Sequence, residues 1–118
     1  MNSLYLVRQD DGEITIAEFS AIIGDLPGTR DLRTENLFRA SADVHYFYED
    51  DRTIIRLSED QQMIAITGTG KASVRAIFEI QKRYAHPLRS FDMDYSYDIT
   101  VTGVTSIEEL RRRIGMPE

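Results

Sequence analysis

Two glycines and a lysine occur together in the stretch ITGTGKAS at positions 66–73, just before an apolar pattern with helical spacing. Loops that cradle phosphate groups are built in this order, with the motif G-x-x-x-x-G-K-[ST]. If Gly70 and Lys71 are aligned with the end of that motif, Ala65 stands where its first glycine belongs. Ala72 then replaces the hydroxyl that would hold Mg²⁺. The sequence therefore does not predict a nucleotide-hydrolysing site.

The same stretch allows a simpler binding chemistry. Backbone amides at the start of a helix can hold an anion, because they point out of the helix with no intrahelical partner. One hypothesis is therefore a regulatory domain that binds a small anionic or phosphoryl ligand at Gly68, Gly70 and Lys71. The other interpretation is a turn, in which the glycines only supply backbone freedom.

Carboxylates form the second group of candidates. Asp50 and Asp51 occupy a predicted hairpin turn, and Asp92, Asp94 and Asp98 alternate along one face of a predicted strand over residues 91–103. Such sets can ligate a metal, transfer protons, bind a partner or keep a strand face solvated. No D-x-D-x-D-G calcium loop occurs, so a partner-binding or solvated surface is favoured over a metal or catalytic site.

Other chemistry-bearing patterns are missing. The two histidines, His45 and His86, are isolated in sequence, and there is no cysteine. The serine motif G-x-S-x-G, the zinc motif H-E-x-x-H and the dinucleotide motif G-x-G-x-x-G do not occur. We therefore expect no catalytic residue, metal ligand or cofactor, although an enzyme assembled from scattered residues would leave no such pattern.

The charge balance indicates the kind of partner. The 118 residues carry a formal charge of −6, which repels nucleic-acid phosphates and suits a basic protein, although acidic chains are also simply soluble. Aromatic side chains in the predicted hairpin would add contact area beside the acids. The predicted partner-binding residues are Tyr48, Asp50, Asp51, Asp92, Asp94 and Asp98.

Hydrophobic periodicity and turn residues locate the elements that would position these side chains. The predicted order is a strand at 3–8, a helix that starts at the capping box of Thr15 and Glu18, a loop at 28–36, an antiparallel meander at 37–67 with a hairpin at 44–57, a helix at 70–85, the strand at 91–103 and a short C-terminal helix near 106–114. In the second helix, Glu79 is expected to point mostly outward with the basic residues.

This order predicts a single α+β domain over residues 1–118. We expect a mostly antiparallel sheet of five or six strands, with two main helices packed on one face and a short C-terminal helix. Strands and helices do not alternate regularly, which disfavours a parallel nucleotide-binding fold. There is no long apolar run, so we expect no membrane contact and a cytoplasmic location. A homodimer that pairs two sheet edges is a third hypothesis for the function.

The layout also resembles small bacterial α+β immunity proteins that are encoded beside polymorphic toxins and are typically acidic, cysteine-free and of about this length. The resemblance is carried by LYLVRQDDGEITIAEFSAII, VHYFYEDDRTIIRL, QQMIAITGTGKASVRAIFEIQKRYAHP and DMDYSYDI, in that order. It implies a protein that inhibits a toxin or enzyme by occupying its active site or a neighbouring surface. It carries no motif whose functional residues could be assigned to this chain.

Overall fold

The computed structural model describes residues 3–35 and 41–115. It is an α+β fold, as the sequence predicts, with these elements in chain order: β1 (Ser3–Arg8), α1 (Ile16–Gly24), β2 (Thr29–Glu35), β3 (Ser41–Tyr48), β4 (Asp51–Leu57), β5 (Ile64–Thr67), α2 (Lys71–Arg83), β6 (Leu88–Asp92), β7 (Asp98–Thr100) and α3 (Ile107–Ile114). None of the described helices is long and apolar enough to cross a membrane.

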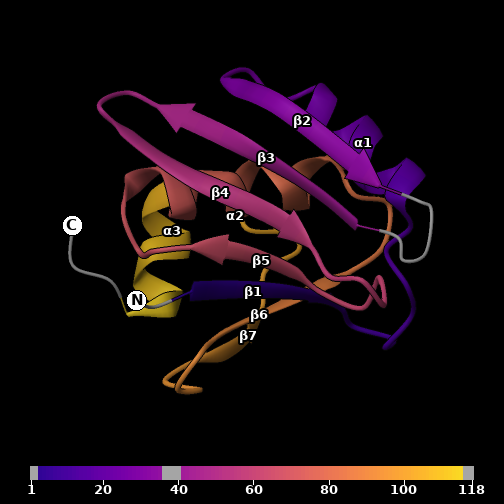
Figure 1. The fold of residues 1–118 in the computed structure, drawn as a ribbon. Helices are drawn as coiled ribbons and strands as arrows, with labels where there is room; N and C mark the ends of the chain where they lie inside the picture. The colour runs from indigo at the N-terminus through magenta and orange to yellow at the C-terminus, as the bar shows by residue number, and fades with distance from the viewer. Residues whose placement is uncertain (1–2, 36–40, 116–118) are drawn as a thin grey trace.

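All described strands belong to one antiparallel sheet in the order β2-β3-β4-β5-β1-β6-β7 (Figure 1). The seven strands exceed the predicted five or six for two reasons. Residues 28–36, expected to be a loop, contain the edge strand β2, and charged residues such as those of β2 are common on sheet edges, where they discourage pairing with another chain. The strand expected at 91–103 is instead a hairpin.

That hairpin changes the predicted placement of the acidic residues. β6 ends at Asp92, and the chain turns before β7 begins at Asp98. Tyr95 takes a left-handed backbone conformation with φ 52°, which no extended strand allows. The expected face shared by Asp92, Asp94 and Asp98 therefore does not exist, and that prediction is wrong.

The meander predicted at 37–67 is confirmed over its described part, from Ser41 in β3 to Thr67 in β5. Residues 37–40 lie outside the described residues. The predicted hairpin at 44–57 is confirmed as β3 and β4, paired from Ala42↔Leu57 to Tyr48↔Asp51. Glu49 and Asp50 form its turn, and the left-handed φ of 54° at Glu49 reverses the chain.

The core lies between the sheet and the helices. Alternate strand residues point to that side, and the fully buried ones include Leu4, Leu6, Val44, Tyr46, Ile55, Leu57, Ile66 and Leu88. α1 starts at the predicted capping box, in which the Thr15 hydroxyl accepts from the amide of Glu18 while the Glu18 carboxylate accepts from the amide of Thr15. α2 lies behind the middle of the sheet and α3 packs beside it (Figure 1). The opposite face of the sheet has no described helix on it.

Candidate functional site

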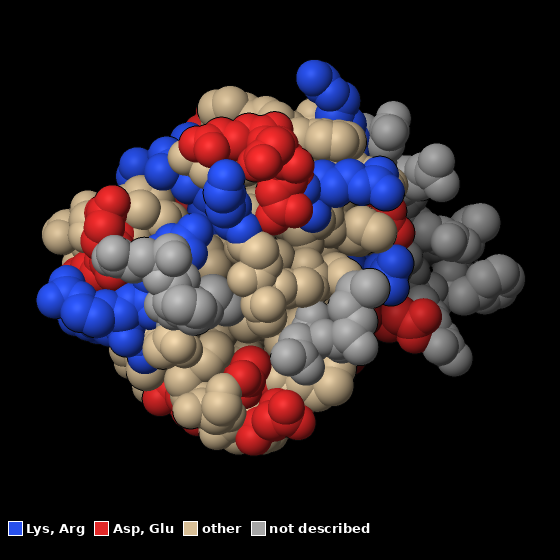
Figure 2. Space-filling model, turned by 90° about the vertical axis from the view of Figure 1, so that its left-hand side faces the viewer, with Lys and Arg blue, Asp and Glu red and all other residues tan. Residues whose placement is uncertain are grey.

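The acidic residues of two turns meet at one end of the sheet. β3, β5 and β6 end there and β4, β1 and β7 begin there, so the β3–β4 and β6–β7 turns project in the same direction. We call this surface the acidic end; its residues are Glu49, Asp50, Asp51, Asp92, Asp94 and Asp98. Figure 2 faces it and shows acidic side chains in an upper and a lower group, with uncharged residues between them. Three inter-strand steps separate β4 from β6, which is about 14 Å.

The upper group is tied to the start of α2. The Asp51 carboxylate accepts a hydrogen bond from the amide of Ala72 at 3.0 Å, and Lys71 Nζ lies 3.1 Å from the Asp50 carboxylate and 3.6 Å from that of Glu49. The hydrogen bond from Lys71 lowers the pKa of Asp50. The N-cap residue Gly70 has no side chain to cap the helix, so Asp51 supplies the missing acceptor from another element.

Gly70 is required by this arrangement. A Cβ atom at position 70 would lie 2.5 Å from Asp51 Oδ2, so any larger residue would push the carboxylate away. The predicted anion site at Gly68, Gly70 and Lys71 therefore already has a carboxylate partner from the chain itself. An external anion would have to compete with Asp51 and with the nearby charges of Glu49 and Asp50.

The lower group shapes the β6–β7 turn. The Asp92 carboxylate accepts from the amide of Ser96 at 2.7 Å and also from its hydroxyl, and the hydroxyl contact is the main cause of a lowered Asp92 pKa. Asp98 pairs with Arg89 Nε at 3.2 Å. Asp94 has no hydrogen bond or ion pair with any residue in the described ranges. The three carboxylates therefore have different roles: Asp92 and Asp98 stabilise the turn, whereas Asp94 faces solvent.

Apolar side chains are exposed beside this turn. Met93 and Tyr95 are 50% and 66% exposed, and Tyr95 stacks on Phe91 with ring centroids 5.0 Å apart. Tyr48, which the sequence places among the contact residues, lies at the same end but is half-buried, with the Arg75 guanidinium 5.1 Å from its ring centroid. The exposed contact area at the acidic end therefore comes from Met93 and Tyr95 more than from Tyr48.

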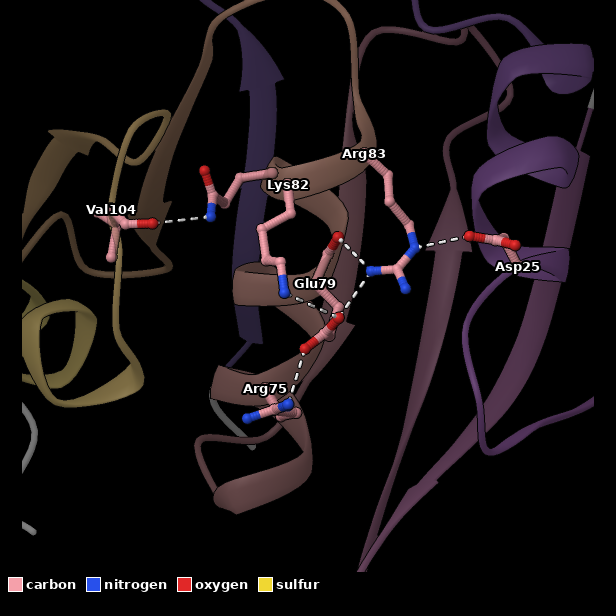
Figure 3. A network of polar contacts seen from close by, with 7 residues as sticks. Asp25, Arg75, Glu79, Lys82, Arg83 and Val104 are labelled. Atoms are coloured by element: carbon pink, nitrogen blue, oxygen red, sulfur yellow. Dashed lines mark hydrogen bonds and ion pairs between the residues drawn. The ribbon is translucent and has the colours of Figure 1, made fainter.

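A second charge cluster lies on α2 (Figure 3). The Glu79 carboxylate, only 8% exposed, accepts from Arg83 at 2.6 Å and pairs with Arg75 at 2.9 Å and Lys82 at 3.9 Å. Arg83 also reaches Asp25, next to the end of α1, at 2.9 Å. The expectation that Glu79 points outward is wrong, because these cations hold its carboxylate against the protein.

The electrostatics of this cluster fit a structural role. Burial alone would raise the pKa of Glu79, but the hydrogen bond from Arg83 and the charges of Arg75 and Lys82 outweigh burial and lower it. An ionised carboxylate held between three cations is a poor proton acceptor, so the cluster links α1 to α2 and is not arranged as a general base.

Other candidate chemistry is not assembled in the part of the chain that the structure describes. There, no three His, Cys, Asp or Glu side chains are grouped so that they could hold a metal ion. His86, between α2 and β6, packs edge-on against Tyr84, with ring centroids 5.6 Å apart, and His45 lies on β3. No family model, curated protein or solved structure matches the chain.

Sequence reasoning located most of the acidic end but missed the exposed pair Met93 and Tyr95. On the continuous strand predicted at 91–103, Met93 and Tyr95 would alternate with Asp92 and Asp94 and would therefore point to the opposite, buried face. The available signal was the density of turn-forming polar residues in DMDYS at 92–96, which favours a reversal over a strand.

Proposed function

We propose that this protein is a small protein-binding domain that engages a basic protein through its acidic end, in the manner of an inhibitor or immunity protein. The observation that carries the proposal is topological: two turns far apart in sequence present carboxylates at the same end of one sheet, beside the exposed Met93 and Tyr95. The net charge of −6 also favours a positively charged partner.

The two kinds of side chain would act differently. Exposed carboxylates such as Asp50, which is 83% exposed, and Asp94 would steer a cationic surface and speed its association. Burial of Met93 and Tyr95 in the complex would stabilise it by about 1 kcal/mol each, because half or more of each residue is now in water. Inhibition would follow from covering the active site of the partner.

The test reverses the charge of Asp94, which has no partner among the described residues and is therefore dispensable for the fold. Tagged wild-type protein, Asp94→Lys and the control Glu13→Lys are used to capture proteins from native lysate, with quantification by mass spectrometry. Glu13 is also exposed but lies in the β1–α1 connection, at the other end of the sheet. We expect a basic protein that wild type and Glu13→Lys retain and Asp94→Lys loses.

The captured protein is then purified and its association measured by stopped flow at several salt concentrations. Asp94→Lys should lower the association rate constant about tenfold at low salt and flatten its salt dependence. The proposal fails if Asp94→Lys and wild type associate equally fast, or if no basic protein is captured. The anionic-ligand and homodimer hypotheses stay predictions, which titration calorimetry with phosphorylated metabolites and light scattering would address.

A further inference from the structure

The face of the sheet opposite the helices has the reverse charge of the acidic end. Residues opposite one another in register share a face, and alternate residues along a strand change face. The described side chains that share this uncovered surface, which we call the open face, are Ser3, Tyr5, Val7, Arg30, Asp43, His45, Phe47, Arg52, Ile54, Arg56, Ala65, Thr67, Arg89, Phe91, Asp98 and Thr100.

The open face is locally cationic. Among the side chains that the structure describes there, four arginines stand against two aspartates, so this set carries about +2 where the whole chain carries −6. Arg89 is neutralised by Asp98, but Arg30, Arg52 and Arg56 make no hydrogen bond or ion pair with any residue that the structure describes. In a chain with 20 acidic and 14 basic residues, carboxylates to pair with them are abundant elsewhere. These arginines are therefore free to pair with an outside anion.

An apolar strip runs between the arginines. Tyr5, Val7, Ile54 and Ala65 are half-buried on the open face, and Phe47, opposite Arg52 in register, is 41% exposed. β5 pairs only with Ile55–Leu57 of β4, so a shallow hollow opens beside the first half of β4, lined in part by Arg52, Ile54 and Thr67. Protein interfaces have this composition: an apolar centre, aromatic anchors and arginine.

We propose that the open face is a second binding surface, which takes a protein surface or segment that presents carboxylates around apolar side chains. This surface lies on the sheet face and shares only Asp98, among the described residues, with the acidic end. The proposal does not depend on the function proposed for that end. Arg52 and Arg56 pair with the carboxylates, and the strip from Tyr5 to Ile54 covers the apolar part.

Two other occupants fit the observations less well. Single-stranded nucleic acid stacks successive bases on several aromatic faces, but of the two phenylalanines on the open face only Phe47 is exposed, since Tyr95 stacks on Phe91 and leaves it 8% exposed. A second copy docked face to face would bring the arginines of both copies together with too few aspartates between them, so like charges would oppose that dimer.

The test uses peptides displayed on phage, selected from a random library on the immobilised wild-type protein. The affinities of selected peptides are then measured by fluorescence anisotropy for wild type, Arg52→Glu, Arg56→Glu and the control Arg112→Glu. Arg112 is an exposed arginine of α3, so its substitution makes the same charge change away from the open face. Circular dichroism verifies that each variant is folded.

We expect the selected peptides to be rich in Asp and Glu beside aromatic or aliphatic residues. Their affinity should fall about tenfold or more in Arg52→Glu and Arg56→Glu and stay unchanged in Arg112→Glu. Peptides without acidic enrichment, or peptides that bind Arg52→Glu and Arg56→Glu as tightly as wild type, would overturn the proposal. The proposal would also be overturned if the wild-type protein bound oligothymidylate, or self-associated in sedimentation experiments, and Arg52→Glu abolished that behaviour.

Discussion

The carboxylate of Asp51 occupies the position at which the sequence around Gly70 and Lys71 predicts a bound anion. Its carboxylate meets the amide of Ala72 at the start of α2, and the absence of a side chain at Gly70 makes room for it. The sequence shows the glycine and the helix start but not the carboxylate, because Asp51 precedes the amide by 21 positions in the chain. A helix cap supplied by another strand has no local pattern.

This contact can be tested with a double-mutant cycle. Asp51→Ala should lower the free energy of unfolding by about 1 kcal/mol, since it removes an N-terminal cap. Gly70→Ala should lower it by a similar amount, because the new Cβ displaces the carboxylate. In the Asp51→Ala background, Gly70→Ala should then cost little. Urea denaturation provides the measurement, and fully additive effects would show that the two residues do not act together.

Because Tyr97 is partly buried, we expect the protein to lose stability at alkaline pH. Its hydroxyl is 2.9 Å from the hydroxyl of the fully buried Ser90, and burial raises the pKa of Tyr97 from 10.0 to about 12. The unfolded chain therefore releases this proton first, so stability is complete below pH 10.0 and falls as pH rises toward about 12. Tyr46 and Tyr84 contribute in the same direction.

The matched variant is Tyr97→Phe, which keeps the ring and removes the proton. Its free energy of unfolding, measured by urea denaturation across this alkaline range, should fall less steeply with pH than that of wild type. Tyrosinate absorbance should also show one fewer late-titrating group in the folded variant. Identical pH profiles would mean that Tyr97 ionises as easily in the folded protein as in the unfolded chain.

At the scale of elements, the Glu79 cluster joins α1 and α2, which both pack against β3. Replacing Glu79 with Gln should lower the free energy of unfolding by about 1–3 kcal/mol at neutral pH, because hydrogen bonds from cations lose their charged acceptor. Because the pKa of Glu79 is lowered from 4.5, its stabilisation is present above that pH and is lost as pH falls through the folded value. The difference between wild type and variant should therefore shrink in acid.

The exposed Glu108 of α3 provides the control for this prediction. Glu108→Gln changes the net charge equally but touches no described cation cluster. Thermal or urea unfolding of the three proteins at neutral and acidic pH gives the comparison. A loss in Glu79→Gln that persists unchanged in acid would point to packing as its cause and not to charge.

Elements with strong local signals were predictable and elements defined by their partners were not. The first strand, the capping box of α1 and the hairpin of β3 and β4 follow from alternation and turn residues. β2 is polar and is a strand only because β3 lies beside it. The sequence of the β6–β7 segment alternates like one strand, but the chain reverses at Tyr95. The reason is that β1, the strand with which β6 pairs, reaches no further than Asp92.

On the scale of the whole molecule, charge is distributed by surface. The acids predicted from sequence do gather at one end, but through two turns and not along one strand face. The arginines of the open face could have been anticipated from R-T-I-I-R at 52–56, where basic and apolar residues share a two-residue period. The net charge of −6 does not reveal this division, because it does not say on which surface each charge lies.

The position of β1 has a consequence for how the chain folds. The first strand of the sequence lies inside the sheet, between β5 and β6, which begin at Ile64 and Leu88. During synthesis β1 leaves the ribosome long before either neighbour exists, and both of its hydrogen-bonding edges stay open until they arrive. The hairpin of β3 and β4 can form early from local contacts, whereas closure of the sheet must wait for nearly the whole chain and makes folding slow for a domain of this size.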